Sequence, residues 1–477
     1  MRKRLVVGLA VAIAVGAWAA APFVTGMWAE RAFRTNLENL SGHPQVDIEV
    51  TAYSRHYLGA EAESRLTLKA PEDTLRIRLH HDIEHGPTFS LPALARITTT
   101  PAIAEDQAKV AAYYFGDQAP LKSQVRIGLT GAQHATFSSP AYHGALHNDR
   151  SVDVDWQGLS GEAEVSAGQD RVTLALTAPG LEVSGQEGSM AMQGLSARSR
   201  MRKQAEHLWL GESDLGLEQL TMDLPNRKDG GRIQAQVAGI KGDSAITEGK
   251  AADLLRVDLG WGFEKATVDS RHFKDGALAM ELHNIDRAAY RELQERATNL
   301  QSADLTQEQL ADQNLALLQE LLPRFLGRSP TLKVTRLQLE TDDGRMQGTA
   351  RAAYRGDREV EALPANPALM LQRLNAHARL TLDKPLLMAV LKATAENKLA
   401  GKDNIGPEQA KRMAPRVAQM RLGMLQGMNI LVAEDGKYSV EASWEEGSVT
   451  VNGRPLGMGM GGGTGQTPMP GGGPGMP

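Results

Sequence analysis

Apolar and polar residues alternate with period two through most of the chain between residues 45 and 285. In residues 75–79, for example, Leu75, Ile77 and Leu79 are separated by two arginines. This period is typical of a β-strand with one buried face. The pattern predicts strands over residues 46–50, 65–68, 75–79, 124–129, 152–156, 163–165, 172–176, 208–210, 217–222, 233–237, 254–259 and 278–282.

Residues typical of turns recur between these segments. They occur at residues 168–170, 179–180, 229–231, 241–243 and 275–276. Many short strands with no helical period between them favour antiparallel meanders over a parallel βαβ sheet. Two arrangements fit equally well, namely an open sheet with an uncovered apolar face and a closed sandwich that buries both inner faces.

Helical patterns are concentrated after residue 285. Residues 286–299 predict one helix, and Thr306 with Gln309 forms a capping box for a second helix that ends at Pro323 or Gly327. Further helices are predicted at residues 386–399 and 407–424, and a hairpin turns at residues 343–344. Strands at residues 432, 438–442 and 449–451 complete the chain. The fold class is therefore α+β, with mostly antiparallel β meanders and helices concentrated in the C-terminal half.

The N-terminus carries the strongest local signal. Residues 5–28 contain no charged residue and follow Arg2, Lys3 and Arg4. As a helix they would span about 36 Å, more than the ~30 Å of a bilayer core. We expect a single-pass anchor in the inner membrane with the bulk of the chain in the periplasm, because the basic cluster stays inside. A cleaved signal peptide is the alternative, since residues 19–21 are all alanine.

These signals divide the chain into four parts. Residues 1–28 are the anchor or signal, 29–285 a β-rich periplasmic region, 286–456 an α+β periplasmic region, and 457–477 a Gly/Met/Pro tail that we expect to be disordered. The chain of 477 residues has a formal net charge of −5, which offers no basic excess for nucleic acid. It has no cysteine, which excludes disulfides and thiolate chemistry.

Known catalytic motifs are missing from the sequence. The stretch at residues 158–162 lacks the final glycine of a nucleophile elbow, and no phosphate-binding loop is present. We therefore predict no enzyme, no catalytic residue and no cofactor.

Residues 80–85 form the densest group of metal-ligand types. On a strand, His81 and His85 would lie about 13 Å apart, too far for one ion. We predict no metal site there and interpret His85, Gly86 and Pro87 as a structural motif that holds a turn. A stripe of Met413, Val417, Met420 and Met424 is interpreted as core packing rather than a binding surface.

Several segments resemble the YdgA-like family of bacterial envelope proteins of unknown function. They are the stretch from His81 to Pro87, the short N-terminal anchor, residues 53–62, residues 282–286, the hairpin at residues 343–344, and residues 447–453. The resemblance implies an inner-membrane-anchored periplasmic protein, and it brings no catalytic residues.

The expected function is non-catalytic. We expect a binding or scaffold protein of the bacterial envelope that contacts envelope proteins or itself as a homo-oligomer. The alternative is a β-groove that binds or handles lipid through an apolar sheet face. An enzyme with an unrecognised site is a third, less favoured hypothesis.

Overall fold

The structure is a computed structural model that describes residues 46–56, 59–70, 73–85, 93–102, 105–225, 231–302, 306–356, 371–401 and 406–455. The predicted anchor and the predicted Gly/Met/Pro tail lie outside these residues. No helix in the described part of the chain is both long and apolar enough to cross a membrane.

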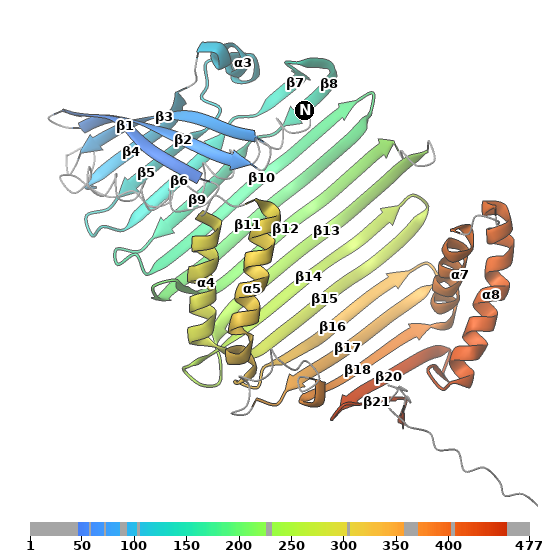
Figure 1. Ribbon diagram of the computed structural model, residues 1–477. Coiled ribbons are helices and arrows are strands. Elements are labelled where there is room, and N and C mark those ends of the chain that lie inside the picture. Colours follow the sequence, from blue (N-terminus) through green and yellow to red (C-terminus); the bar gives the residue numbers. More distant parts are fainter. Residues whose placement is uncertain are drawn as a thin grey trace, which may run out of the picture.

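The described strands form one antiparallel sheet (Figure 1). Each strand from β1 to β6 pairs with the next, β6 then pairs with β9, and β9 with β10. From β10 to β18 the order again follows the chain, and β20 to β22 complete it. The N-terminal strands are β1 (Val46–His56), β2 (Gly59–Ala70), β3 (Asp73–His85), β4 (Ala95–Ala102), β5 (Lys122–Ile127), β6 (Gln133–Ser139), β7 (Tyr142–Leu146), β8 (Asp149–Trp156) and β9 (Leu159–Val165).

The central strands are much longer than the sequence pattern predicted. They are β10 (Arg171–Gly185), β11 (Gly188–Ala205), β12 (Leu208–Pro225), β13 (Arg232–Glu248), β14 (Leu254–Val268) and β15 (Arg271–Asp286). The C-terminal strands are β16 (Thr331–Thr341), β17 (Gly344–Tyr354), β18 (Leu374–Asp383), β19 (Val432–Glu434), β20 (Lys437–Glu445), β21 (Ser448–Val451) and β22 (Arg454–Pro455). At about 3.3 Å per residue, the 18 residues of β12 reach roughly 60 Å.

Two helix pairs lie against the sheet (Figure 1). The first pair is α4 (Arg287–Ser302) and α5 (Gln307–Leu326), and the second is α7 (Lys384–Ala400) and α8 (Pro407–Gly427). A further helix, α3 (Glu105–Phe115), packs near β7. The predicted capping box is confirmed, because Thr306 accepts from the Gln309 amide and the Gln309 side chain accepts from the Thr306 amide.

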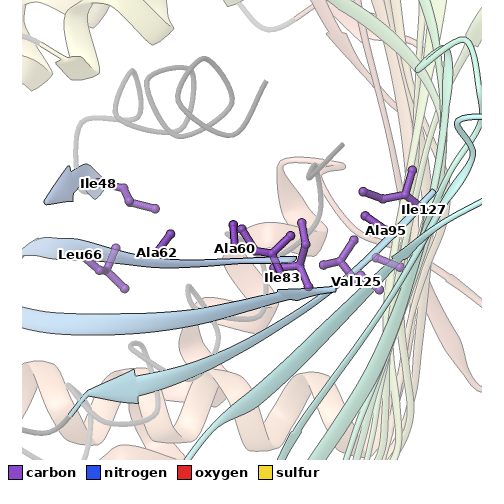
Figure 2. Close-up of a cluster of buried hydrophobic side chains, with 11 residues drawn as sticks. Ile48, Ala60, Ala62, Leu66, Ile83, Ala95, Val125 and Ile127 are labelled. Atoms are coloured by element: carbon purple, nitrogen blue, oxygen red, sulfur yellow. The ribbon is translucent and has the colours of Figure 1, made fainter. Parts of the chain in front are cut away.

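The core is richest where the N-terminal strands curve. Aliphatic side chains from β1 to β6 and β9 are almost fully buried there, and Figure 2 shows them as a continuous series along the curved strands. A second cluster contains Leu208, Leu255 and Ile285, and it packs against Tyr290 of α4 and Phe325 of α5. A third contains Tyr438 of β20 and Leu387 of α7. Both helix pairs therefore bury apolar residues of the sheet.

The predicted turns at residues 179–180, 241–243 and 275–276 are wrong, because each lies inside a long strand. Close approach of neighbouring strands explains two of these glycines. A Cβ at Gly276 would lie 2.1 Å from the ring of Phe263, and one at Gly242 would lie 3.1 Å from the ring of Trp261. A side chain at residue 276 would therefore displace Phe263, and one at residue 242 would crowd Trp261, so both glycines fit close neighbours on the next strand and neither ends its strand.

Three left-handed residues mark one line across the central strands. Gly194, Gly239 and Asp275 have φ angles of 64°, 66° and 49°. Each stands next to one row of cross-strand partners, formed by Gln193, Gln219, Ala238, Lys265 and Lys274.

The apolar series shifts by one position at this line. In β12, Leu215 and Leu217 precede it, whereas Leu220 and Met222 follow it. A left-handed residue reverses the face to which the following side chains point. The apolar residues therefore stay on one face of the sheet although their positions in the sequence shift by one.

Candidate functional site

One face of the sheet carries an unbroken row of apolar residues across ten strands. Each member is the direct cross-strand partner of the next. The row is Leu176, Ala197, Leu215, Gly242, Trp261, Leu278, Leu337, Gly348, Leu380 and Val440. Direct partners in a ladder point to the same side of a sheet. We call this side the apolar face. With strands about 4.8 Å apart, its ten strands span roughly 43 Å.

The two helix pairs cover only parts of the apolar face. Tyr290 of α4 and Phe325 of α5 pack against the buried cluster that contains Leu255 and Ile285. Leu387 of α7 belongs to the cluster against which Val440 packs. The middle of the face is exposed, as shown by Trp261 at 56% and Leu215 at 40% of their full accessibility. Leu259 and Leu332 are exposed on the same face. Exposed apolar residues that gather on one face of a protein are a sign of a binding surface.

A hollow of 280 Å³ lies in this face over β16, β17, β18, β20 and β21. Small side chains line much of it, and Leu332, Val334, Trp444 and Val449 contribute larger apolar groups. The small residues are Ala350, Ala352, Ala376, Ala378 and Ala442. Because alanine leaves space above the backbone, the hollow can hold an apolar group that is not part of the sheet.

The opposite face is charged and solvated. Arg200 of β11 pairs with Glu212 of β12 at 2.7 Å, and Lys241 of β13 pairs with Glu264 of β14 at 2.8 Å. The hydrogen bond to His283 and the neighbouring Arg256 hold the pKa of the Glu281 carboxyl below its usual value. The sheet is therefore amphipathic, with ion pairs and water on the charged face and mostly apolar side chains on the apolar face.

His81 is an ionisable side chain in the buried N-terminal part of the apolar face. It is 1% exposed. Its Nε2 lies 2.8 Å from Ser64 Oγ and its Nδ1 lies 2.9 Å from Thr99 Oγ1. Burial, assisted by the neighbouring His80, lowers the pKa of His81 from 6.5 to about 3. The ring is therefore neutral at physiological pH, and it joins three strands through hydroxyl groups.

The predicted structural motif at His85 lies partly outside the described residues. His85 ends β3 opposite Ala95, whereas Gly86 and Pro87 are not among the described residues. The predicted alternation of this strand is confirmed, because His81 and Ile83 are buried while Asp82 and Glu84 are exposed. Within the described ranges, no three His, Asp or Glu side chains gather as a group that could hold a metal ion.

The methionine stripe of α8 is not core packing, and that interpretation is wrong. Its three methionines, Met413, Met420 and Met424, are all exposed, with Met420 at 69%, and Val417 between them is half-buried. Met428, directly after the helix, is exposed as well. The core side of α8 is instead formed by Ala410, Ala414 and Ala418, which are fully buried. Alanines allow the close approach of α8 to α7, so the bulky methionines remain on the outer side.

Sequence reasoning missed the hollow and the length of the apolar face. The alternating alanines of β17 and β18 carried a weak signal, since small apolar residues at every second position predict a strand with space above it. Strands β11 and β18 were not predicted, because serines, arginines and alanines dilute their apolar alternation.

The comparisons with known proteins identify the family. The family model described as "Bacterial protein of unknown function (DUF945)" matches residues 1–458. The chain belongs to this bacterial family, whose function is unknown. The narrower likeness to YdgA-like proteins stays a prediction. None of the curated proteins matches the chain.

Proposed function

We propose that this protein binds the hydrocarbon chains of lipids along the apolar face of its sheet. The observation that carries the proposal is the continuous apolar row across ten strands, whose middle is exposed at Trp261 and Leu215. Burying apolar surface yields about 25 cal/mol per Å², so an acyl chain lying on this face would be stabilised along its whole length.

The dimensions support an elongated ligand. A bilayer core of about 30 Å contains two leaflets, so one acyl chain extends for roughly 15 Å. The face spans roughly 43 Å across its strands, which is longer than one such chain. The hollow at Ala350 and Ala378 provides 280 Å³, just below the ~300 Å³ of the smallest small-molecule sites, so it fits part of an acyl chain rather than a whole lipid.

We further propose that the protein works at the inner membrane, held by residues 5–28, with the sheet in the periplasm. The uncharged length of that segment supports the anchor. Carbonate extraction is expected to leave the protein in the membrane pellet. A mature N-terminus that begins after the alanines at 19–21 would instead support a cleaved signal peptide.

The lipid proposal is tested by filling the hollow. Replacing Ala378 with Trp places a large ring in the hollow, whereas Arg379→Trp adds the same ring one residue along β18 on the opposite face. The full chain is extracted from membranes in mild detergent and its bound lipids are counted by mass spectrometry. We expect Ala378→Trp to retain severalfold less phospholipid than the wild type and Arg379→Trp to retain the same amount. Equal lipid in all three proteins would contradict the proposal.

A further inference from the structure

We infer that the outer face of α8 is a docking surface for an anionic lipid bilayer. This surface, the α8 face, consists of the exposed Met413, Met420, Met424 and Met428 with the cationic residues beside them. It is separate from the apolar face of the sheet, and the inference does not depend on acyl-chain binding there.

The exposed side of α8 combines an apolar stripe with positive charge. At 3.6 residues per turn, Met413, Met420 and Met424 follow one stripe, and Arg416 and Arg421 fall on its two sides. Met428 stands directly after the C-terminal end of the helix. The helix contains four cationic residues and one acidic residue, 4 − 1 = +3, in a chain whose net charge is −5. An exposed apolar stripe bordered by Arg and Lys is the pattern of a helix that lies in a membrane interface.

The ion pairs of the two helix pairs differ sharply. Two arginines join α4 and α5, with Arg296 on Glu320 at 2.7 Å and Arg324 on Glu292. On α8, Lys411, Arg412, Arg416 and Arg421 form no ion pair with any described carboxylate. Cationic side chains next to exposed apolar groups are the combination that an anionic lipid surface attracts.

Packing leaves this stripe free to reach a bilayer. Ala410, Ala414 and Ala418 bury one side of α8, and Leu422 and Leu425 belong to the cluster that joins α7, α8 and β20. The methionines are on another side of the helix. Flexible thioether side chains adapt to an irregular apolar environment such as the upper acyl region, and the long arginines can extend to the phosphate level.

The absence of cysteine makes a direct test available. We introduce single cysteines at Met424, in the stripe, and at Gln419, on the exposed polar side of the same helix. Each full-length variant is labelled with an environment-sensitive fluorophore and reconstituted in vesicles of phosphatidylcholine alone or mixed with phosphatidylglycerol. An aqueous quencher then reports the accessibility of the label.

We expect the Met424 label to be quenched severalfold less in anionic vesicles than in neutral ones, while the Gln419 label remains accessible in both. Arg416→Glu with Arg421→Glu should restore quenching at position 424, and so should high salt, because screening weakens surface attraction. Equal quenching of the Met424 label in both kinds of vesicle would overturn the inference. Shielding of that label in detergent without vesicles would also overturn it, since a protein segment or a second copy would then cover the stripe. Neither result would bear on lipid retention at Ala378.

Discussion

Trp261 lies directly across the ladder from Gly242, and its ring lies 3.1 Å from the place that a Cβ of Gly242 would occupy. The ring therefore spreads over the neighbouring strand in a position that a side chain at residue 242 would disturb. It does so while 56% exposed, so most of this large apolar group meets solvent. This arrangement contributes little to folding, and it presents an aromatic surface to a ligand.

Trp261 and Leu255 should therefore differ in their roles, although both belong to β14. Leu255 is fully buried beneath α4 and α5. Replacing Leu255 with Ala is expected to lower the free energy of unfolding by about 2 to 5 kcal/mol. Trp261→Ala should cost less than about 1 kcal/mol but reduce the amount of co-purifying lipid. Urea denaturation and lipid mass spectrometry measure the two effects, and a large loss of stability in Trp261→Ala would contradict this division.

Stability should fall in acid through His81. Its pKa is about 3 in the folded protein and 6.5 in the unfolded chain, so the unfolded state binds a proton first as the pH falls. The contribution of neutral His81 is complete above pH 6.5 and decreases by about 1.4 kcal/mol per pH unit between pH 6.5 and 3. His81→Gln, which does not titrate, should show a weaker fall between pH 7 and 5 in urea denaturation. An identical pH dependence in the two proteins would show that His81 is not responsible.

Asp286 should be the main attachment of the first helix pair. Its Oδ1 accepts from the Ala289 amide at 2.7 Å, and its Oδ2 accepts from Arg328 Nε at 2.7 Å. It is buried, so Asp286→Ala removes a helix cap and leaves Arg328 without that partner. We expect a loss of about 2 to 3 kcal/mol. Asp253→Ala is the control, because Asp253 also pairs with Arg328 but is exposed, and its loss should cost under about 1 kcal/mol. Equal effects of the two substitutions would refute this role for Asp286.

Position 239 should require glycine for two reasons, its left-handed backbone conformation and the closeness of Glu264. It has a φ of 66°, and a Cβ there would lie 2.5 Å from Cγ of Glu264. Gly239→Ala is expected to lower the melting temperature, with about 1 to 2 kcal/mol due to the left-handed conformation. Adding Glu264→Ala removes the two closest atoms, Cγ and Cδ, and leaves only the Cβ of residue 264 at 2.8 Å, so it should recover part of the loss. No recovery in the double variant would mean that backbone strain alone accounts for the effect.

The sequence predicted the local elements where a strong local signal existed. The capping box at Thr306 begins α5, and Asp435 with Gly436 makes the turn between β19 and β20, because these residues act on their immediate neighbours. Glycines inside long strands were wrongly predicted as turns. Gly242, for example, makes room for the ring of Trp261 on the neighbouring strand, a contact that the local sequence does not show. The open sheet was one of two arrangements left open, because period-two alternation is the same whether or not a second layer covers the face.

The sequence predicted that an apolar sheet face exists, but not which residues form the candidate site. The apolar alternation indicated a face, but the row from Leu176 to Val440 depends on register across ten strands, which no single strand encodes. The Met420 stripe was visible in the sequence, yet its exposure depends on how the alanines of α8 pack on α7.

The most direct test of the acyl-chain account compares Leu215 with Asp214. These neighbours on β12 are both exposed and point to opposite faces, with Leu215 opposite Gly242 and Asp214 opposite Asp243. A photoreactive amino acid is placed at each position in the full chain, cells are irradiated, and phospholipid attached to the purified protein is measured. The account predicts phospholipid cross-links at position 215 and background at position 214. Equal labelling at both positions, or protein cross-links alone at position 215, would contradict it.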